Sequence, residues 1–440
     1  MLFIGTFATA DGLMVAFITL GLLALVLSAT DRVRPHHILL LTIALAGAAL
    51  AKSAMAVVPL MIVGGALLFG RRALGLGRRY LLWCLLAALL AAAAFAAWLL
   101  PCNAATGGKF VARHFGRHVG DRATRPLEGH GGNVLLWLPF YLPVVLGGFA
   151  PWAPLLGGGL STAIGKRLAG ARGRALLLGA VVPVFVAFSL VATKLAHYVL
   201  PIWPGLALIV GGTLERARRG ELHPRDRRWL RGGLLLTALF TLTCAVVAAV
   251  GPWFLTLPDL RLAGAVAAVP LAGVALATAW AWRRRRATAA AVAMAAGMAL
   301  TWCALAAFGH PAFEAERTVP RFAREIADAV GPDGPIAVWG FGEPSLVFYA
   351  GRPLRNLDAE KARERAVLRW LREPGGGALV TVEARLPGLR KRYGGPLDAD
   401  VIATARHLNT GNGKVERLLA IRRGTLGSLP PLAGSDTGRR

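Results

Sequence analysis

The sequence is poor in acidic residues and in cysteine. Its 440 residues hold 23 Asp and Glu against 50 Lys and Arg, which leaves a formal net charge of +27. The four cysteines show none of the spacings of metal or redox motifs, and no glycine-rich nucleotide loop is present. The sequence therefore gives no support to a cysteine-based metal or redox centre, or to a nucleotide bound by such a loop.

Apolar residues are abundant and come in long blocks. They make up 55% of the chain, and the mean hydropathy is +0.55. Each block is close to the roughly 20 residues that a helix needs to cross a bilayer. The pattern predicts a polytopic, mainly α-helical membrane protein with about ten spans. The blocks are 12–30, 37–51, 54–70, 80–100, 133–157, 175–192, 195–213, 232–254, 262–282 and 287–308.

The hydrophobic runs stop near residue 309, which divides the chain into two predicted domains. Residues 1–309 form the transmembrane domain, and residues 310–440 form a small α/β domain with a disordered tail from Gly427. Apolar runs at 335–340 and 377–384 predict buried strands. Helical spacing of apolar residues predicts a helix over 359–373. This alternation favours a small layered fold.

Basic charge follows the connections between the blocks. It is concentrated in every second connection: at 32–34, 71–79, 166–174, 216–231 and 283–286. Positively charged loops stay on the cytoplasmic side of a membrane. This rule places the N-terminus and the C-terminal domain on the outer side, outside the cytoplasm. The charge is thus a topology signal, and nucleic acid is not an expected partner.

The same topology gathers ionisable residues at the outer boundary. Asp11 begins the first span, Lys52 separates the second and third, and Lys194, His197 and Tyr198 form a later outer turn. Each has a purely structural alternative. The lysines would extend to the interface, Asp11 would cap a helix, and His197 and Tyr198 would anchor the boundary.

The longest outer loop, 103–133, is harder to explain structurally. It is rich in arginine and histidine although it lies on the side that should be poor in positive charge. Arginine and lysine form charge-assisted hydrogen bonds to phosphate oxygens, and at a membrane surface the available phosphate belongs to a lipid headgroup. We therefore expect membrane lipids or a lipid phosphate as partners.

Five segments resemble one enzyme family in the order that the family has them. They are "TADGLM" at Asp11, "LAKSAMAVVPLM" at Lys52, the run 110–156, "SLVATKLAHYVLPIWPGLALIV" and "PIAVWGFGEPSLVFYAGRPL". Together they are similar to bacterial polyprenyl-phosphate-dependent membrane glycosyltransferases, related to protein O-mannosyltransferases and to the lipid A aminoarabinose transferase. The resemblance implies a GT-C-type helical bundle in the bacterial inner membrane, with the N-terminus and a small C-terminal domain on the periplasmic side.

The resemblance also implies an activity. A sugar would pass from a polyprenyl-phosphate donor to a hydroxyl of lipid A, another glycolipid, a glycan or a protein at the outer face. It implies no particular cofactor, no metal-binding residue is assigned, and a divalent metal is left open. Tyr198 and His197 would line the substrate site, and Asp11 would orient or deprotonate the acceptor. The residues expected to bind the donor phosphate are Lys52, His118, Arg122 and Lys194.

Two departures from the family pattern keep alternatives open. Arg117 stands where the family commonly has an acid, and the family's first outer loop with its Asp–Glu pair has no counterpart before Asp11. We therefore expect that this sequence lacks one or two N-terminal spans. An inactive relative that binds a lipid-linked sugar is one alternative. A lipid or solute transporter is a second, which the absence of internal repeats disfavours.

Overall fold

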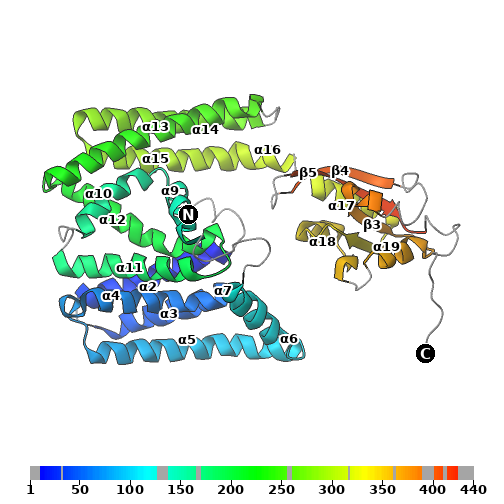
Figure 1. Ribbon diagram of the computed structural model, residues 1–440, viewed down its shortest axis with the longest axis horizontal. Helices are drawn as coiled ribbons and strands as arrows, with labels where there is room; N and C mark the ends of the chain where they lie inside the picture. Colours follow the sequence, from blue (N-terminus) through cyan, green and yellow to red (C-terminus); the bar gives the residue numbers. More distant parts are fainter. Residues whose placement is uncertain are drawn as a thin grey trace. The chain divides into compact units, whose positions relative to one another are not determined.

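The computed structural model describes residues 10–30, 33–125, 137–164, 170–254, 260–315, 318–359, 363–388, 401–409 and 414–424. The predicted disordered tail lies outside these residues. The chain forms two compact units, Met1–Phe308 and Gly309–Arg440 (Figure 1). The expected boundary was one residue later.

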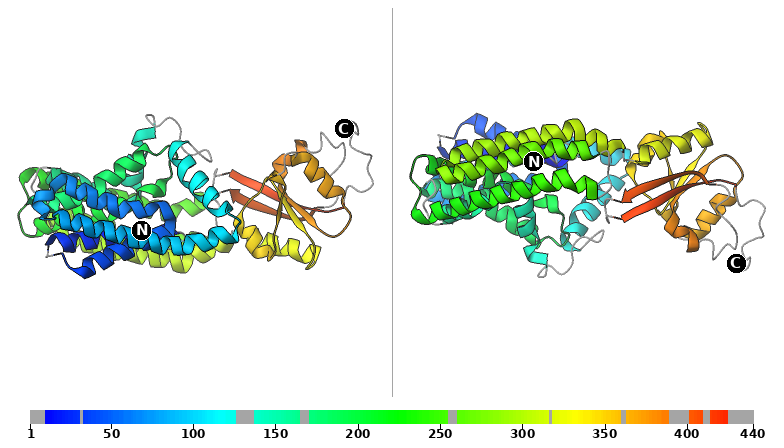
Figure 2. Two further views of the ribbon diagram at one scale, coloured as in Figure 1. Left: turned by 90° about the horizontal axis from the view of Figure 1, so that it is seen from below. Right: turned by 90° about the horizontal axis from the view of Figure 1, so that it is seen from above.

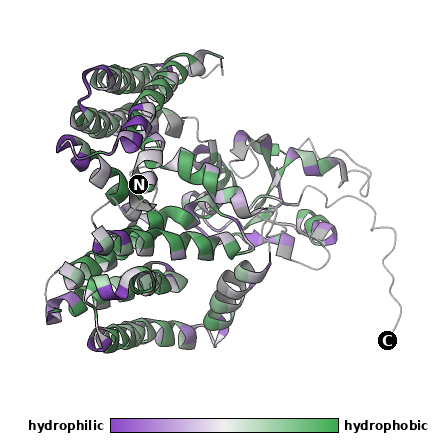
Figure 3. Ribbon diagram, turned by 60° about the vertical axis from the view of Figure 1, so that its left-hand side comes forward, coloured by the Kyte–Doolittle hydropathy of each residue, from purple (hydrophilic) through white to green (hydrophobic). Residues whose placement is uncertain are grey.

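The first unit is a bundle of long apolar helices. Eight helical runs among the described residues are long and apolar enough to cross a membrane, or nine if one bent pair forms a span. Figure 3 shows hydrophobic residues along these helices and hydrophilic ones at many of their ends. The predicted multi-pass membrane fold is confirmed. The long helices are α2 (Ala10–Thr30), α3 (Pro35–Lys52), α4 (Val57–Leu74), α5 (Arg78–Ala105), α11 (Gly170–Leu190), α12 (Trp203–Arg218), α13 (Pro224–Phe254), α14 (Leu260–Arg284) and α15 (Ala287–Ala304).

The second and third predicted blocks lie in one helical run, Pro35–Leu74. The run contains two helices, α3 and α4, because the backbone leaves the helical region at Lys52, where φ is −159° and ψ is 66°. Each helix has 18 residues, about 27 Å at 1.5 Å per residue, close to the bilayer core thickness. Lys52 therefore lies at a helix end.

The fifth block was predicted as one continuous span, but its described part forms two helical segments with a sharp bend between them. Helix α9 (Tyr141–Gly148) and the segment Ala153–Ser161 are bent by 113°. Glycine and proline near the break disfavour a continuous helix, because proline offers no N–H to the helical ladder. The carbonyl of Pro151 instead accepts a hydrogen bond from Thr237 Oγ1 of α13, at 3.0 Å. A neighbouring helix thus satisfies backbone that the bend frees.

Small residues allow α4 and α11 to approach closely. A Cβ atom at Gly179 of α11 would lie 2.3 Å from the backbone nitrogen of Ala66 in α4, and one at Gly65 would lie 2.3 Å from Pro183 Cγ. Close backbone approach through small residues is a common source of helix association in membranes. This contact holds together the helices that lead to the two lysine motifs.

The second unit is a mixed sheet with helices on both faces (Figure 2). The strand order is β2-β1-β3-β5-β4, with β1 parallel to β2 and β3, and β5 antiparallel to β3 and β4. The central strands are buried on both sides. The elements are α16 (His310–Ala315), α17 (Thr318–Val330), β1 (Ile336–Trp339), α18 (Pro344–Ala350), β2 (Arg355–Asn356), α19 (Arg363–Arg372), β3 (Ala378–Val382), β4 (Val401–Asn409) and β5 (Lys414–Arg422).

Alternate side chains of the central strands face two different cores. Ile336 and Val338 pack with Phe322 of α17. Ala337 and Trp339 pack on the opposite face with Leu371 of α19. This two-sided burial explains why the strands are continuous apolar runs. Strands β1 and β3 and helix α19 lie where the sequence predicts them, whereas α17 and the β4–β5 pair were not predicted.

Candidate active site at one end of the bundle

The start of α2 and the end of α3 meet at one end of the bundle. Asp11 lies in the first turn of α2, and Lys52 is the last residue of α3. Their side chains form an ion pair, with 2.6 Å between Lys52 Nζ and Asp11 Oδ1. The two side chains are 32% and 13% exposed, so the pair is accessible at its lysine end. Two residues 41 positions apart in the sequence thus form one charged centre.

An aromatic side chain from η5 (Ala196–Ile202) lies beside the lysine of this ion pair. Lys52 Nζ lies 5.7 Å from the ring centroid of Tyr198, within the range of a cation–π contact. Tyr198 is 8% exposed and packs on Phe188 and edge-on against His197, with centroid separations of 5.7 and 5.1 Å. The structure therefore brings Asp11, Lys52, Tyr198 and His197 into one group.

Lys194 has a different environment from Lys52. It is 2% exposed, and its ammonium donates hydrogen bonds to the carbonyls of Ser189 and Val191 at 2.5 and 2.6 Å. A third, longer contact of 3.5 Å reaches the carbonyl of Phe188. These carbonyls lie at the C-terminal end of α11, where backbone acceptors lack helical partners and positive charge is favourable. Lys194 therefore caps α11.

Burial also affects the protonation of Lys194. Desolvation lowers the pKa of its ammonium below the ordinary lysine value, because water no longer stabilises the charged form. The ring of Tyr141 from α9 lies 5.6 Å from Lys194 Nζ, and Tyr141 is fully buried. Sequence reasoning missed Tyr141, whose only signal was a polar aromatic residue inside an apolar block.

The basic loop is largely helical as far as residue 125. It contains α6 (Lys109–Val111), the π-helix η2 (Ala112–Asp121) and α7 (Arg122–Thr124). His118 lies in η2 and Arg122 begins α7, but the side chains of both lie outside the described part of the chain, as do residues 126–136 of the loop and following span.

Two hydrogen bonds hold the end of this loop beside Lys194. The amide of Ala192 donates to the carbonyl of Ala123 at 3.1 Å. The hydroxyl of Thr193 donates to the carbonyl of Arg125 at 2.8 Å. The backbone that carries Arg122 is thus attached to the segment that carries Lys194. Among the described residues, no group of three or more His, Cys, Asp and Glu could hold a metal ion.

The fold and this charged end define the class: a multi-pass membrane protein of GT-C type with a small α/β unit. Its fold is that of ArnT from Cupriavidus metallidurans, whose structure has been solved in the apo state and bound to undecaprenyl phosphate. The apo structure matches with a TM-score of 0.66 and 20% identity over 97% of this chain and 76% of that chain. The bound structure matches with a TM-score of 0.64 and 19% identity over 98% and 76%.

Curated relatives agree with this fold. An undecaprenyl phosphate-alpha-4-amino-4-deoxy-L-arabinose arabinosyl transferase from Edwardsiella ictaluri is 33% identical over 119 residues, 27% of this chain and 20% of that protein. A second transferase of this name, from Sodalis glossinidius, is 35% identical over 116 residues, 26% of this chain and 20% of that protein. The match thus spans a fifth of each relative. No family model matches the chain. The resemblance found in the motifs is confirmed.

Proposed function

We propose that this protein transfers a sugar from a polyprenyl-phosphate donor to an acceptor hydroxyl. The observation that carries the proposal is the Asp11–Lys52 ion pair beside Tyr198. It lies in a fold shared with an ArnT that was crystallised with undecaprenyl phosphate. The curated relatives are named as undecaprenyl-phosphate-dependent arabinosyl transferases, which supports the same class of donor.

We place the reaction on the outer side of the bacterial inner membrane. The basic connection 71–79 begins in the last turn of α4, and Lys52 lies at the opposite end of that helix, where α3 gives way to α4. If arginine-rich connections stay in the cytoplasm, the Asp11–Lys52 pair faces the periplasm. The same assignment puts residues 310–440 on the periplasmic side. The acceptor is the hydroxyl of a lipid or glycan available there.

The chemistry requires positive charge at the leaving group. The bond from the anomeric carbon to the phosphate oxygen breaks, the acceptor oxygen forms the new bond, and the acceptor proton is transferred to a base. The polyprenyl phosphate leaves as a stable anion, so stabilising its growing charge matters more than protonating it. Lys52 supplies that charge, and His118 and Arg122 on η2 and α7 would add to it.

The ion pair suggests how Lys52 and Asp11 work together. A donor phosphate would compete with the Asp11 carboxylate for the Lys52 ammonium. Drawing Lys52 toward the phosphate leaves Asp11 as an acceptor for the hydroxyl proton, and general-base help of this kind is typically worth about 10²–10⁴-fold in rate. Tyr198 and His197 would line the space beside the reacting groups. In this mechanism Asp11 functions only when the donor is present.

Lys194 remains a predicted phosphate-binding residue. Its ammonium would have to give up at least one α11 carbonyl to reach a phosphate, and its burial opposes that exchange. It would also position η5, because it caps the end of α11 and stands three residues before His197. Both roles predict lower activity for Lys194→Ala, but only the second predicts a parallel loss of stability.

Transfer of radiolabelled sugar from polyprenyl-linked donors in membranes tests the proposal. We expect transfer by the wild type and a large loss with Asp11→Asn, whereas Asp328→Asn, which removes an exposed carboxylate on α17, should leave it unchanged. Binding of the donor without transfer in the wild type would instead favour a protein that holds a lipid-linked sugar. Loss of activity in both variants would contradict a specific role for Asp11.

A further inference from the structure

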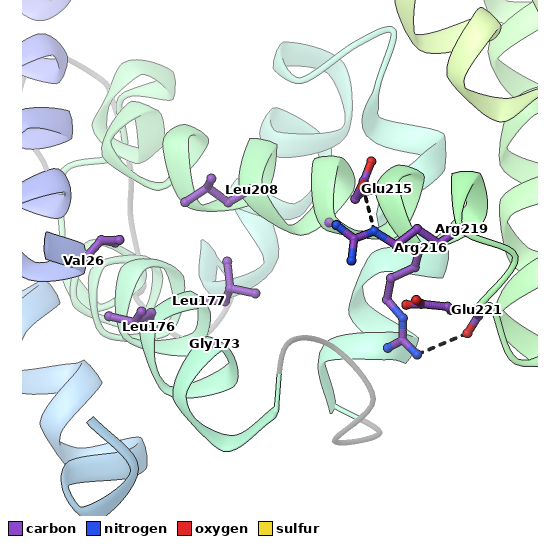
Figure 4. Close-up of a pocket in the computed structure, with 10 residues that line it drawn as sticks. Val26, Gly173, Leu176, Leu177, Leu208, Glu215, Arg216, Arg219 and Glu221 are labelled. Atoms are coloured by element: carbon purple, nitrogen blue, oxygen red, sulfur yellow. Dashed lines mark hydrogen bonds and ion pairs between the residues drawn. The ribbon is translucent and has the colours of Figure 1, made fainter. Parts of the chain in front are cut away.

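A second site lies at the other end of the bundle from Asp11 and Lys52. A pocket of about 610 Å³ is bounded by the late part of α2, the early part of α11 and the late part of α12 (Figure 4). Val26 of α2 lies 15 residues after Asp11, roughly 22 Å along the helix at 1.5 Å per residue. The pocket is therefore separate from the proposed active site.

The wall of the pocket is apolar and its mouth is charged. Figure 4 shows apolar side chains on one side and the charged end of α12 on the other. This change from apolar to charged within one pocket matches the change from acyl chain to headgroup at a bilayer boundary. The apolar residues are Val26, Leu176, Leu177 and Leu208, and the charged ones are Glu215, Arg216, Arg219 and Glu221.

The arginine that enters this pocket has unused donors. Arg216 Nη2 donates to the carbonyl of Glu221 at 3.2 Å. Its Nε and Nη1 atoms are buried and have no acceptor among the described residues. A buried donor without an acceptor is costly, and a guanidinium has only donors to offer. The site is complementary to a ligand with more than one acceptor oxygen.

The acidic side chains of the mouth do not cancel this positive charge. The Glu215 carboxylate is already shared by Arg218 and Arg219, with N–O distances of 2.7–2.8 Å. Glu221 is exposed, and the hydrogen bonds that join it to Arg216 use its backbone carbonyl and amide. The whole connection 216–231 carries seven arginines against two acidic residues. An anion is therefore favoured over a cation or a zwitterion.

We propose that this pocket binds the headgroup of an anionic phospholipid of the membrane leaflet on the arginine-rich side. The phosphodiester and glycerol oxygens would accept from Arg216 Nε and Nη1, and an acyl chain would lie along Leu176, Leu177 and Leu208. Leu208 is 49% exposed, so the chain leaves the pocket toward the lipid. A bound lipid would link α2, α11 and α12 at the end opposite the active site.

Native mass spectrometry of the full chain in detergent tests this site with added phosphatidylglycerol or phosphatidylcholine. The wild type should retain one phosphatidylglycerol at concentrations roughly tenfold below those needed for phosphatidylcholine. Arg216→Gln should weaken phosphatidylglycerol binding by roughly tenfold or more, since hydrogen bonds to charged groups are lost. The matched control Arg227→Gln removes the same charge from an exposed position on α13 outside the pocket and should change nothing.

Further measurements distinguish the binding of a lipid from the binding of a free anion and from the effects of misfolding. Leu208→Gln should weaken retention of phosphatidylglycerol, and millimolar inorganic phosphate should not displace it. Arg216→Lys keeps the positive charge but has one donor nitrogen in place of three, and it should give an intermediate loss if Arg216→Gln does not fold. Equal binding of the two lipids, equal effects of Arg216→Gln and Arg227→Gln, or displacement by phosphate would each overturn the proposal.

Discussion

The two lysines that the motifs place together have opposite surroundings. Lys52 is partly exposed, pairs with the Asp11 carboxylate and lies beside the Tyr198 ring. Lys194 is 2% exposed and donates to carbonyls at the end of α11. A cation held by one carboxylate can exchange it for a phosphate, whereas a cation held by several buried carbonyls stabilises the fold. The same residue type therefore holds an exchangeable carboxylate partner at one position and caps a helix at the other.

Asp11→Asn should change the rate of sugar transfer more than any other substitution proposed here. Sugar transfer should fall by about 10²–10⁴-fold, because the amide keeps the shape but cannot accept the acceptor proton. Transfer rates from a polyprenyl-linked donor at saturating concentration measure this. Donor binding should be retained, and a fall in donor affinity with an unchanged maximal rate would contradict a role for Asp11 as base.

Replacing each lysine by methionine compares the two positions directly. Lys194→Met should lower the free energy of unfolding by about 1.5–3 kcal/mol, since charged hydrogen bonds to buried carbonyls are lost. Lys52→Met should cost less than about 1 kcal/mol, because the ion pair it breaks is partly exposed. Thermal unfolding in detergent measures both. Equal losses would mean that Lys52 also has a structural role.

The pH dependence of stability tests the buried environment of Lys194, which Lys52 does not share. The pKa of Lys194 is lowered in the folded protein, so between that value and the unfolded value of about 10.4 the unfolded chain binds more protons. Stability contributed by this group therefore rises with pH through that window. Lys194→Met should lose this rise, which unfolding measurements from neutral to alkaline pH would detect. An unchanged slope would contradict the assignment.

Two glycine substitutions test the packing that supports both regions. Gly179→Ala should destabilise the protein by about 1–3 kcal/mol, because the new Cβ meets the Ala66 backbone at 2.3 Å. Gly211→Ala in α12 meets nothing within 4 Å and should be neutral or stabilising by up to about 1 kcal/mol. Thermal unfolding of the two variants provides the measurement. A loss of stability in both would mean that the α4–α11 approach is not the cause.

Tyr198→Leu should have the smallest effect. It removes the ring that faces Lys52, a contact worth about 0.5–1 kcal/mol at a partly exposed site. We expect a few-fold change in the Michaelis constant for the donor, while Tyr198→Phe retains the ring and stays near the wild type. A loss as large as that of Asp11→Asn would give the Tyr198 side chain a direct part in the reaction.

Several parts of the fold could be predicted because they depend on local composition. Apolar blocks of bilayer length indicated the helical runs, and their end near residue 309 lies beside the division at Phe308. Strands β1 and β3 were visible because both their faces are buried, which makes them continuous apolar runs. The β4–β5 pair was not, because its polar and apolar residues mix without a clear period.

The bend after α9 shows the limit of hydropathy. The block 133–157 is apolar throughout, and hydropathy alone cannot distinguish a straight span from two helices at 113°. Thr237 of α13 satisfies the Pro151 carbonyl at the break. That partner lies 86 residues away in the sequence, so only the packed bundle shows that the bend is tolerated.

For the candidate site, the residue types at the ends of the apolar helices could be read from the sequence. Asp11, Lys52 and Lys194 stand at such ends because charge is disfavoured at the centre of a span. The packing of the bundle determines which of these ends meet and where each side chain points. It paired Lys52 with Asp11 and directed Lys194 back to α11, because partner choice depends on helix packing over tens of residues.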